Sequence, residues 1–538
     1  MPKKEQRIIY GAIAILFVCF LGFPLILLLA NMFATGEEGL FSNISYVVTQ
    51  KEFFSSLGNS FLISGVSGLV TTVLAFVMAY TVNYTNIPKW LRSFIIVMVA
   101  VPMLFPTITY GFAIIYSFGK QGLITGFLGK QLLDIYGFNG LLLGYVAYTL
   151  PTAFLLLHNT FKYIDKKYLT VSQLMGDSPT KCFMVTTFRP MIATICTAMI
   201  QAFFLCFTDY GIPAAVGGEF NVIATTLYNQ MLGASPNFGR GAVVAMMMLL
   251  PSVLSIIIQH RLDKTNFRYS KISQVELPKN PLRDILLGTF STGTLLAVLS
   301  IFAVVFVIPF VRQWPYDKTA SFSTFFIRIE GSNITGTLVN SITVSLITAV
   351  IGSVLVYACG LISQRSSGGT RLRTSIDKIA LITNTIPGMV LGVAFMLAFS
   401  GTPLQNTLAI IIISNLIHFF STPYFMAKNA LAKMNNAFET TAKLMGDSWI
   451  QSVFRVIIPN SIRTLAEIFG YYFINAMVTV SAVIFIAGAR TMVLTTKIKE
   501  FQHYGKFEEI FVLSLLIFII NLLAKLLVRF ISKRKERI

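Results

Sequence analysis

Few residues in this chain of 538 could do chemistry, and the most unusual of them lie inside long apolar stretches. Asp209 and Tyr210 fall near the end of one stretch, and Asn475 and Ser481 fall within another. Polar groups are costly inside an apolar span and usually serve a solute or ion pathway. We therefore predict that these four residues line a pathway. The alternatives are that Asp209 caps a broken helix before Gly211 and that Asn475 bonds between helices.

Cysteine and histidine do not indicate a metal centre. The chain has five cysteines and four histidines, and neither set has the spacing of metal ligands or disulfide pairs. The sequence also lacks a glycine-rich loop ending in Lys-Ser or Lys-Thr, which would bind nucleotide phosphates. We predict no catalytic residue, metal or cofactor in this chain, so any energy from ATP must come through another protein.

A pentapeptide, Leu-Met-Gly-Asp-Ser, occurs at 174–178 and again at 444–448. Each copy lies in a polar, basic segment between two apolar stretches. A plain capped turn on the surface would explain one copy. Two identical copies at equivalent places instead predict two docking surfaces for partner proteins. Their central residues are Gly176, Asp177 and Ser178 in the first copy and Gly446, Asp447 and Ser448 in the second.

The residue types around the first copy predict a helix, a turn and a second helix. A short helix can run from about residue 168 to 175, and Gly176 suits the position after its end, where φ is positive. Ser178 can cap the next helix, and Pro179 at its first position has no N–H to lose. The second copy has Trp449 in place of the proline.

Composition predicts an all-α polytopic membrane protein. The chain is 55% hydrophobic and 12% charged, with a mean hydropathy of +0.73, whereas soluble domains carry about 25% charged residues. Apolar runs of about 20 residues fit spanning helices, and barrel strands would be about half as long. The twelve expected spans are 8–33, 57–83, 92–118, 139–160, 190–212, 239–260, 284–311, 336–362, 376–400, 405–428, 460–488 and 509–530.

The distribution of Lys and Arg predicts that both termini are cytoplasmic. With this orientation most of the 42 basic residues lie in inner segments, as the positive-inside rule requires. The outer segments hold basic and acidic residues in equal number, so the net charge of +20 belongs to the inner side and to Lys525 in the last span. We attribute the charge to topology and contact with anionic membrane lipids, and expect no nucleic-acid partner.

The two halves of the chain repeat beyond the pentapeptide. Asn59-Ser60 and Asn340-Ser341 open equivalent spans 281 positions apart, and the blocks 105–111 and 386–392 match at the same offset. Because the pentapeptides lie 270 apart, the first half must carry about eleven extra residues. We place them in the outer loop Gly119–Asn139.

Six spans in each half predict parallel repeats, related by an axis along the membrane normal. The first half is 1–260, a cytoplasmic linker covers 261–283, and the second half is 284–538. We expect Pro106 and Pro387 to break the third and ninth spans, because proline removes a helical hydrogen bond.

The pentapeptide segments resemble the EAA loop of permeases of binding-protein-dependent ABC importers. That loop has Glu-Ala-Ala, three residues, a glycine, and an Ile-x-Leu-Pro end nine residues later. In the second copy 440–442 stand for Glu-Ala-Ala and 457–459 for the end. In the first copy 170–172 stand for Glu-Ala-Ala, and the stretch 176–190 is one residue longer than the family spacing. Neither copy has the motif's glutamate in register, and Glu439 is one place early.

A second resemblance narrows the branch. Residues 208–213, 217–218, 221–222, 224–225 and 237–239 look like the fused permeases of the ferric iron, thiamine and 2-aminoethylphosphonate group. Residues 476–485 resemble the corresponding place in their second halves. The first block is most similar to phosphonate-type members and does not separate them from ferric iron members.

These resemblances imply the permease of a type I ABC importer in the cell membrane, which does no catalysis itself. Two cytoplasmic ATPase subunits, which hold ATP and Mg²⁺, would each receive one pentapeptide turn as a coupling helix. An extracellular or periplasmic binding protein would deliver the solute, either a phosphonate such as 2-aminoethylphosphonate or ferric iron. ATP-driven closure of the ATPase pair would then switch the spans between inward-open and outward-open states.

Two other classes of function stay open. An ion-coupled secondary transporter with two six-helix halves would carry carboxylates deep in its spans, and these spans hold few. An integral membrane enzyme would cluster His, Asp or Glu at one membrane interface, and the sequence has no such cluster.

Overall fold

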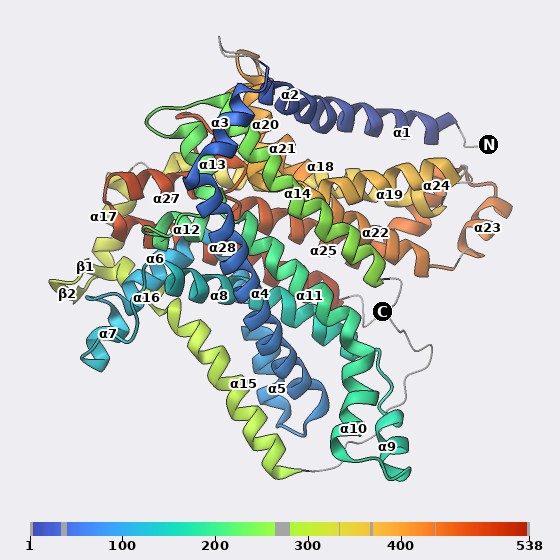
Figure 1. The fold of residues 1–538 in the computed structure, drawn as a ribbon. Helices are drawn as coiled ribbons and strands as arrows, with labels where there is room; N and C mark the ends of the chain where they lie inside the picture. The colour runs from blue at the N-terminus through green and yellow to red at the C-terminus, as the bar shows by residue number, and fades with distance from the viewer. Residues whose placement is uncertain are drawn as a thin grey trace.

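The computed structural model describes residues 4–33, 40–263, 280–332, 334–365, 370–435 and 437–534, and these are almost entirely helical (Figure 1). In the described part, two short antiparallel strands, β1 (Val311–Gln313) and β2 (Asp317–Ala320), form a single hairpin. The all-α prediction is therefore confirmed. Most of the linker predicted at 261–283 lies outside the described residues.

The helices of the first half run from the N-terminus to the linker. They are α1 (Lys4–Phe17), α2 (Phe23–Met32), α3 (Ser42–Thr49), α4 (Lys51–Tyr84), α5 (Lys89–Met98), α6 (Thr107–Phe118), α7 (Leu123–Leu128), α8 (Phe138–Phe161), α9 (Lys167–Leu174), α10 (Pro179–Phe183), α11 (Arg189–Thr208), α12 (Gly211–Val216), α13 (Ile223–Leu232) and α14 (Phe238–Asp263).

The helices of the second half follow the linker, with the hairpin of β1 and β2 between α16 and α17. They are α15 (Pro281–Ile301), α16 (Ala303–Val307), α17 (Phe322–Gly331), α18 (Ile334–Arg365), α19 (Thr370–Thr385), α20 (Gly388–Phe399), α21 (Leu408–His418), α22 (Ser421–Lys433), α23 (Ala437–Leu444), α24 (Trp449–Ser452), α25 (Ile458–Val478), α26 (Val483–Ile486), α27 (Leu494–His503) and α28 (Phe507–Arg534).

Eight helical segments in the described part are long and apolar enough to cross a membrane, or up to eleven if each bent pair counts as one span. This measure thus accounts for up to eleven of the twelve predicted spans in the described residues. The predicted span 460–488 corresponds to α25, which carries Arg463, Glu467 and Asn475 and is not among the segments that meet this measure. It also ends earlier than predicted, at Val478, and the predicted span 190–212 ends at Thr208.

Both expected proline breaks are present. The chain bends by 104° between α5 and α6, at Pro106, and by 99° between α19 and α20, at Pro387. A third bend, of 53°, separates α21 from α22 inside the predicted span 405–428. The sequence analysis missed this bend because no proline lies between the two helices; Pro423 falls within the first turn of α22, where proline is tolerated.

The eleven-residue difference between the halves lies in the predicted outer loop. In the first half, 119–137 connects α6 to α8 and contains the short helix α7. In the second half, 400–407 makes the same connection between α20 and α21. These loops hold 19 and 8 residues, so their difference is 11 and accounts for the change of offset.

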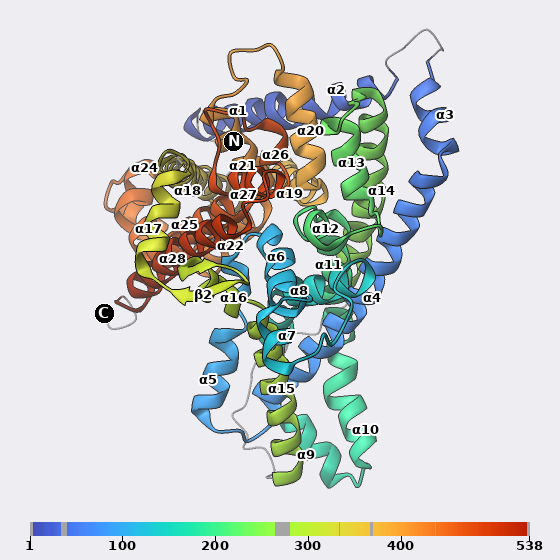
Figure 2. The ribbon, with the colours of Figure 1, turned by 90° about the vertical axis from the view of Figure 1, so that its left-hand side faces the viewer.

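The first helix of each half packs against the other half (Figure 2). The segment α1–α2 contacts α18, α20 and α21, with the Phe17 ring 4.7 Å from that of Phe420. In return α15 packs on α4, α5 and α6, and Ser291 Oγ donates to Thr81 Oγ1 at 2.9 Å. The two halves are thus interlocked rather than laid side by side.

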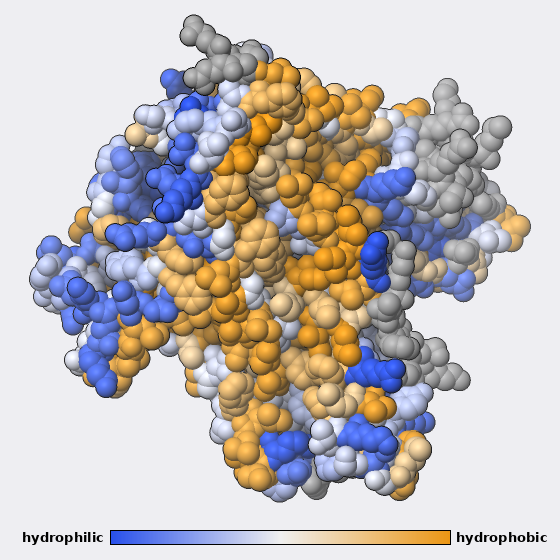
Figure 3. Space-filling view, viewed as in Figure 1, coloured by the Kyte–Doolittle hydropathy of each residue, from blue (hydrophilic) through white to orange (hydrophobic). Residues whose placement is uncertain are grey.

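An apolar surface, called the belt below, covers the middle of the face seen in Figure 3. In Figure 3, hydrophobic residues spread over the central helices, while hydrophilic residues gather at the left, over α27, β1 and β2, and at the right, over α22 to α24. The exposed apolar side chains of the belt include Leu62, Leu69 and Val73 on α4. A surface of this kind fits the hydrocarbon layer of a membrane.

Candidate docking turns and solute pathway

The first pentapeptide forms a helix, a turn and a second helix, as predicted. Helix α9 ends at Leu174, and Gly176 has a φ of +79°. The Asp177 N–H donates to Ser172 O at 3.2 Å, which closes the α9 end in the manner of a Schellman turn. Ser178 Oγ accepts the Lys181 N–H at 3.4 Å and caps α10.

The second pentapeptide has the same backbone. Gly446 has a φ of +86°, and the Asp447 N–H donates to Ala442 O at 3.0 Å. Ser448 forms a capping box with Gln451, since each side chain accepts the backbone N–H of the other residue, at 3.3 and 2.8 Å. Helix α24 thus begins with a reciprocal cap, whereas α10 begins with Pro179.

The two aspartates brace the turns rather than point to a ligand. Asp177 Oδ1 lies 2.6 Å from Lys181 Nζ, and Ser172 Oγ donates to its Oδ2 at 2.7 Å. The hydrogen bond from Lys181, followed by that from Ser172, holds the pKa of Asp177 below its usual value. Asp447 Oδ1 similarly accepts from Arg455 Nη1 at 3.1 Å. In each copy a basic residue ties the turn to the segment that follows.

Apolar side chains are the most exposed part of both turns. Leu174 and Met175 are 83% and 76% exposed, and Leu444 and Met445 are 84% and 80% exposed. These turns lie in polar segments, so a membrane does not explain the exposure. An exposed Leu-Met pair on each turn is consistent with the predicted docking surface for a partner protein.

The glutamate that is out of register has an internal partner. Glu439 Oε1 lies 3.8 Å from Arg365 Nη1 at the end of α18. Arg365 Nη2 also donates to the backbone oxygens of Leu431 and Met434. Glu439 therefore helps to anchor α23 to the helix bundle and does not face outward as a docking group.

The repeated Asn-Ser pairs form matching contacts in the two halves. Ser60 Oγ accepts the Ile223 N–H at 2.7 Å, and Ser341 Oγ accepts the Leu494 N–H at the same distance. The preceding Asn59 donates to Asn221 O at 3.0 Å, and Asn340 donates to Met492 O at 3.1 Å. Each pair thus holds the start of a short helix, α13 or α27, against a long one.

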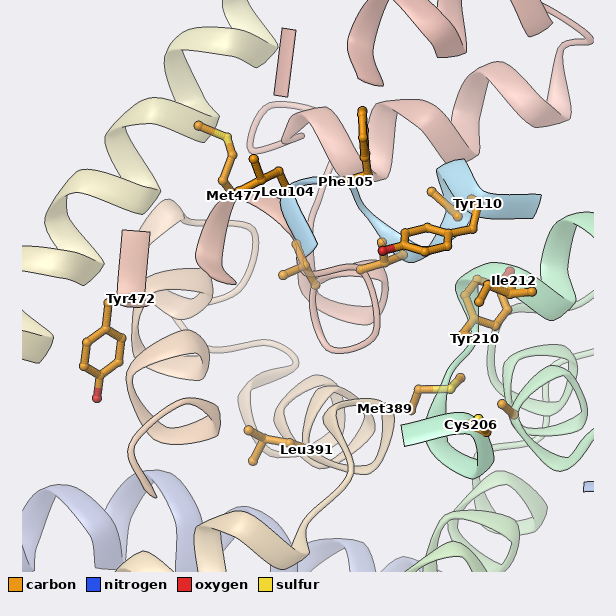
Figure 4. Packing of buried hydrophobic residues seen from close by; sticks show 14 of the residues in the cluster. Leu104, Phe105, Tyr110, Cys206, Tyr210, Ile212, Met389, Leu391, Tyr472 and Met477 are labelled. Carbon is orange, nitrogen blue, oxygen red and sulfur yellow. The ribbon is translucent and has the colours of Figure 1, made fainter. Parts of the chain in front are cut away.

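Asp209 lies at the break between α11 and α12 and is 4% exposed. Its Oδ2 accepts the Ile212 N–H at 2.9 Å, a bond typical of a carboxylate at a helix start. The geometry matches the capping alternative. Figure 4 shows Ile212 of α12 close to Tyr110 of α6, where these two helices pack together. Asp209 is not part of the pocket described next.

Tyr210 lines a pocket of about 380 Å³ between the two halves. Its ring stacks on that of Tyr228 at 4.7 Å. The Lys499 ammonium, from the second half, lies 5.6 Å from the Tyr210 ring centre and 5.3 Å from the Tyr228 ring centre. Gln502 Nε2 donates to Ala214 O at 2.7 Å and closes the same interface.

Lys499 and Gln502 were missed in the sequence analysis. An internal repeat in the sequence could have identified Lys499. At the start of α13 the Thr225 hydroxyl accepts the Val222 N–H, and at the start of α27 the Thr496 hydroxyl accepts the Val493 N–H, 271 positions later. This offset aligns Lys499 with Tyr228.

Asn475 and Ser481 lie apart from this pocket. Asn475 Nδ2 donates to Tyr471 O of its own helix at 2.8 Å, so the structure shows a bond within α25 and not between helices. Ser481 packs beside Gly388, where a side chain would press on Ser481 and His418. In the first half, Thr107 is the equivalent of Gly388 and Gly211 is the equivalent of Ser481. A hydroxyl side chain thus packs on a glycine in both halves, but the two residue types occupy opposite positions.

Residues 71–268 and 357–537 both match the family described as the binding-protein-dependent transport system inner membrane component. The chain belongs to this family. Its two matching segments show a fused permease with two halves, embedded in the membrane, and the family consists of transporter components rather than enzymes.

Two relatives that match most of the chain are named as ferric transport permeases. The chain is 24% identical over 503 residues to the putative ferric transport system permease protein FbpB 1 of Haemophilus influenzae, covering 89% of this chain and 78% of the relative. It is 22% identical over 530 residues to the ferric transport system permease protein FbpB of Actinobacillus pleuropneumoniae, covering 94% and 75%.

A shorter relative covers about half of the chain. The spermidine/putrescine transport system permease protein PotC homolog of Mycoplasma pneumoniae is 21% identical over 231 residues, 43% of this chain and 77% of its own length. Family members with a single half therefore exist beside fused ones.

Proposed function

We propose that this chain is the permease of an ABC importer that moves ferric iron across the cell membrane. Two ATPase subunits, which bind ATP and Mg²⁺, dock on the turns at 174–178 and 444–448 from the cytoplasm, where both chain termini also lie. An external binding protein delivers the solute to the opposite face. The family membership supports the importer role, and the names of the ferric transport relatives support iron as the solute. A phosphonate is the second candidate from the sequence resemblance.

The observation that carries the docking role is the duplicated turn. Two copies share the pentapeptide, the positive φ at glycine, the capped following helix and the exposed Leu-Met tip. Each copy is also followed by a π-helical turn, Met184–Phe188 or Val453–Ile457, which leads into the next long helix. A movement of either turn would therefore be transmitted directly into α11 or α25.

Native purification and uptake measurements test this function together. The chain, tagged in its own cells, should co-purify with two copies of one ATPase, and membrane vesicles should take up radioactive ferric iron only with ATP and the binding protein. Uptake that a protonophore abolishes while ATP is present would instead support an ion-coupled transporter. Uptake of 2-aminoethylphosphonate in place of iron would support the importer function but show that the solute is a phosphonate.

A further inference from the structure

The pocket between the halves is centred on a half-buried lysine. Lys499 Nζ donates to Gln502 Oε1 at 2.9 Å, and among the described residues it forms no ion pair with a carboxylate. The described residues that line the pocket include no Asp or Glu. Lys499 is therefore a positioned positive charge without a counter-ion from the described part of the chain.

The position of Lys499 in the repeat places it at the axis that relates the halves. The offset of 271 makes Lys499 the equivalent of Tyr228, and these two side chains contact each other. Equivalent residues of two repeats can meet only close to their common axis. A solute that crosses between the halves has to pass along this axis.

The remaining lining suits a small polar ligand. Tyr210 and Tyr228 hold the ammonium over their rings, within the ~6 Å range of cation–π contacts. Asn221, Thr225 and Asn229 add amide and hydroxyl groups. The volume of about 380 Å³ lies at the lower end of the range for small-molecule sites, roughly 300–1,000 Å³.

We propose that Lys499, with Tyr210 and Tyr228, forms an anion-binding site on the solute path, so that the solute passes as an oxyanion or as an anionic chelate of iron. This inference rests on the proposed importer function and adds the charge class of its solute. A bare ferric ion would be repelled by the ammonium. No group of three His, Cys, Asp or Glu in the described residues is placed to hold a metal ion.

Protection of Lys499 from acylation tests binding directly. The full chain in lipid nanodiscs is treated with an amine-reactive label, and the modification rates of Lys499 and of the exposed Lys506 are followed by mass spectrometry. Phosphate, methylphosphonate and ferric citrate are the anionic probes, and ethanolamine is the cationic probe. An anion present at about twice its Kd should slow labelling of Lys499 roughly threefold, because only the empty fraction reacts.

The different anionic probes show which kind of anion binds the site. Protection by methylphosphonate and phosphate alone indicates an oxyanion site, and protection by ferric citrate alone indicates a chelate site. Equal slowing at Lys506, protection by ethanolamine, or protection by none of the probes overturns the proposal. This readout needs neither ATPase nor binding protein, so its failure leaves the importer function untouched.

Uptake by the complete importer provides the second readout. Lys499→Met should lower the uptake rate about tenfold or more if the charge supports passage, Lys499→Arg should keep most of it, and Lys506→Met should match wild type. Membrane insertion and ATPase co-purification show that each variant is assembled. Wild-type uptake by Lys499→Met, or faster uptake by Lys499→Glu, overturns the anion path. Absence of uptake in the wild type contradicts the proposed function instead.

Discussion

At the scale of single residues, the two pentapeptide glycines are required by backbone geometry. Gly176 and Gly446 have φ values of +79° and +86°, and a Cβ at either would meet nothing within 4 Å. The constraint is thus conformational and not steric crowding. The left-handed region costs about 1–2 kcal/mol for other residues, so the turn would shift if either glycine were replaced.

Gly446→Glu should abolish uptake and uncouple ATP hydrolysis while the protein still inserts, because it strains the turn and adds a charge beside the exposed Leu444 and Met445. Uptake and ATPase activity of the reconstituted importer measure the effect. Gly129→Glu is the matched control, since Gly129 also has positive φ, +71°, and open surroundings, but lies between α7 and α8 and outside both pentapeptide turns. Normal transport by the Gly446 variant would sink the docking role.

Asp209 gives a second prediction at this scale. Asp209→Asn keeps an oxygen that can accept the Ile212 N–H, so we expect wild-type uptake and melting temperature. Asp209→Ala removes the cap and should destabilise the fold by about 1 kcal/mol. Thermal unfolding in detergent and uptake assays compare the two variants. A large loss of uptake in Asp209→Asn, with unchanged stability, would show that the carboxylate itself serves the pathway.

At the scale of elements, the Asn-Ser pairs explain why α13 and α27 begin where they do. Ser341 Oγ donates to Thr337 O at 3.0 Å and accepts the Leu494 N–H at 2.7 Å. Ser60 has the same two bonds, with Ser56 O and the Ile223 N–H. One hydroxyl thus joins a long helix to the first N–H groups of a short one, which no intrahelical carbonyl can satisfy.

Ser341→Ala should destabilise the protein by about 1–3 kcal/mol, because it leaves the buried Leu494 N–H without an acceptor. Ser353→Ala is the control on the same helix. The Ser353 hydroxyl donates to Ala349 O, and among the described residues it accepts no backbone N–H from another helix. Melting temperatures of the two variants measure the difference. Equal shifts would mean that the contact between α18 and α27 adds nothing.

At the scale of the whole molecule, the two halves are held together because the first helix of each half packs against the other half. Segment α1–α2 packs on the second half, and α15 packs on the first. Phe105 of the first half also stacks between Phe302 and Phe518 of the second, with ring centres 4.9 and 4.8 Å away. The association of the halves therefore does not depend on the covalent linker alone.

A chain cut between residues 270 and 271 should still assemble. The fragments 1–270 and 271–538, expressed together, are expected to co-purify, because each contributes a helix to the other's surface. Removal of residues 1–32 from the first fragment should weaken this association, which co-purification through a tag on the second fragment measures. Fragments that never associate would show that the linker is essential.

Local features of the candidate site could be predicted from the sequence. The breaks at Pro106 and Pro387, the helix end at Gly176 and the cap at Ser178 all depend on residues close in the chain. Backbone chemistry of proline, glycine and serine acts over a few residues, so the amino-acid order is enough to specify it.

The sequence by itself determined the membrane class, the repeat and the two turns, because hydropathy, residue offsets and capping residues are local or periodic properties. Only the tertiary structure decided that α1 and α15 each pack against the other half and that the Lys499 ammonium lies over the rings of Tyr210 and Tyr228. Residues that lie far apart in the chain come together only when whole helices pack, and helix packing depends on side-chain shape across many elements at once.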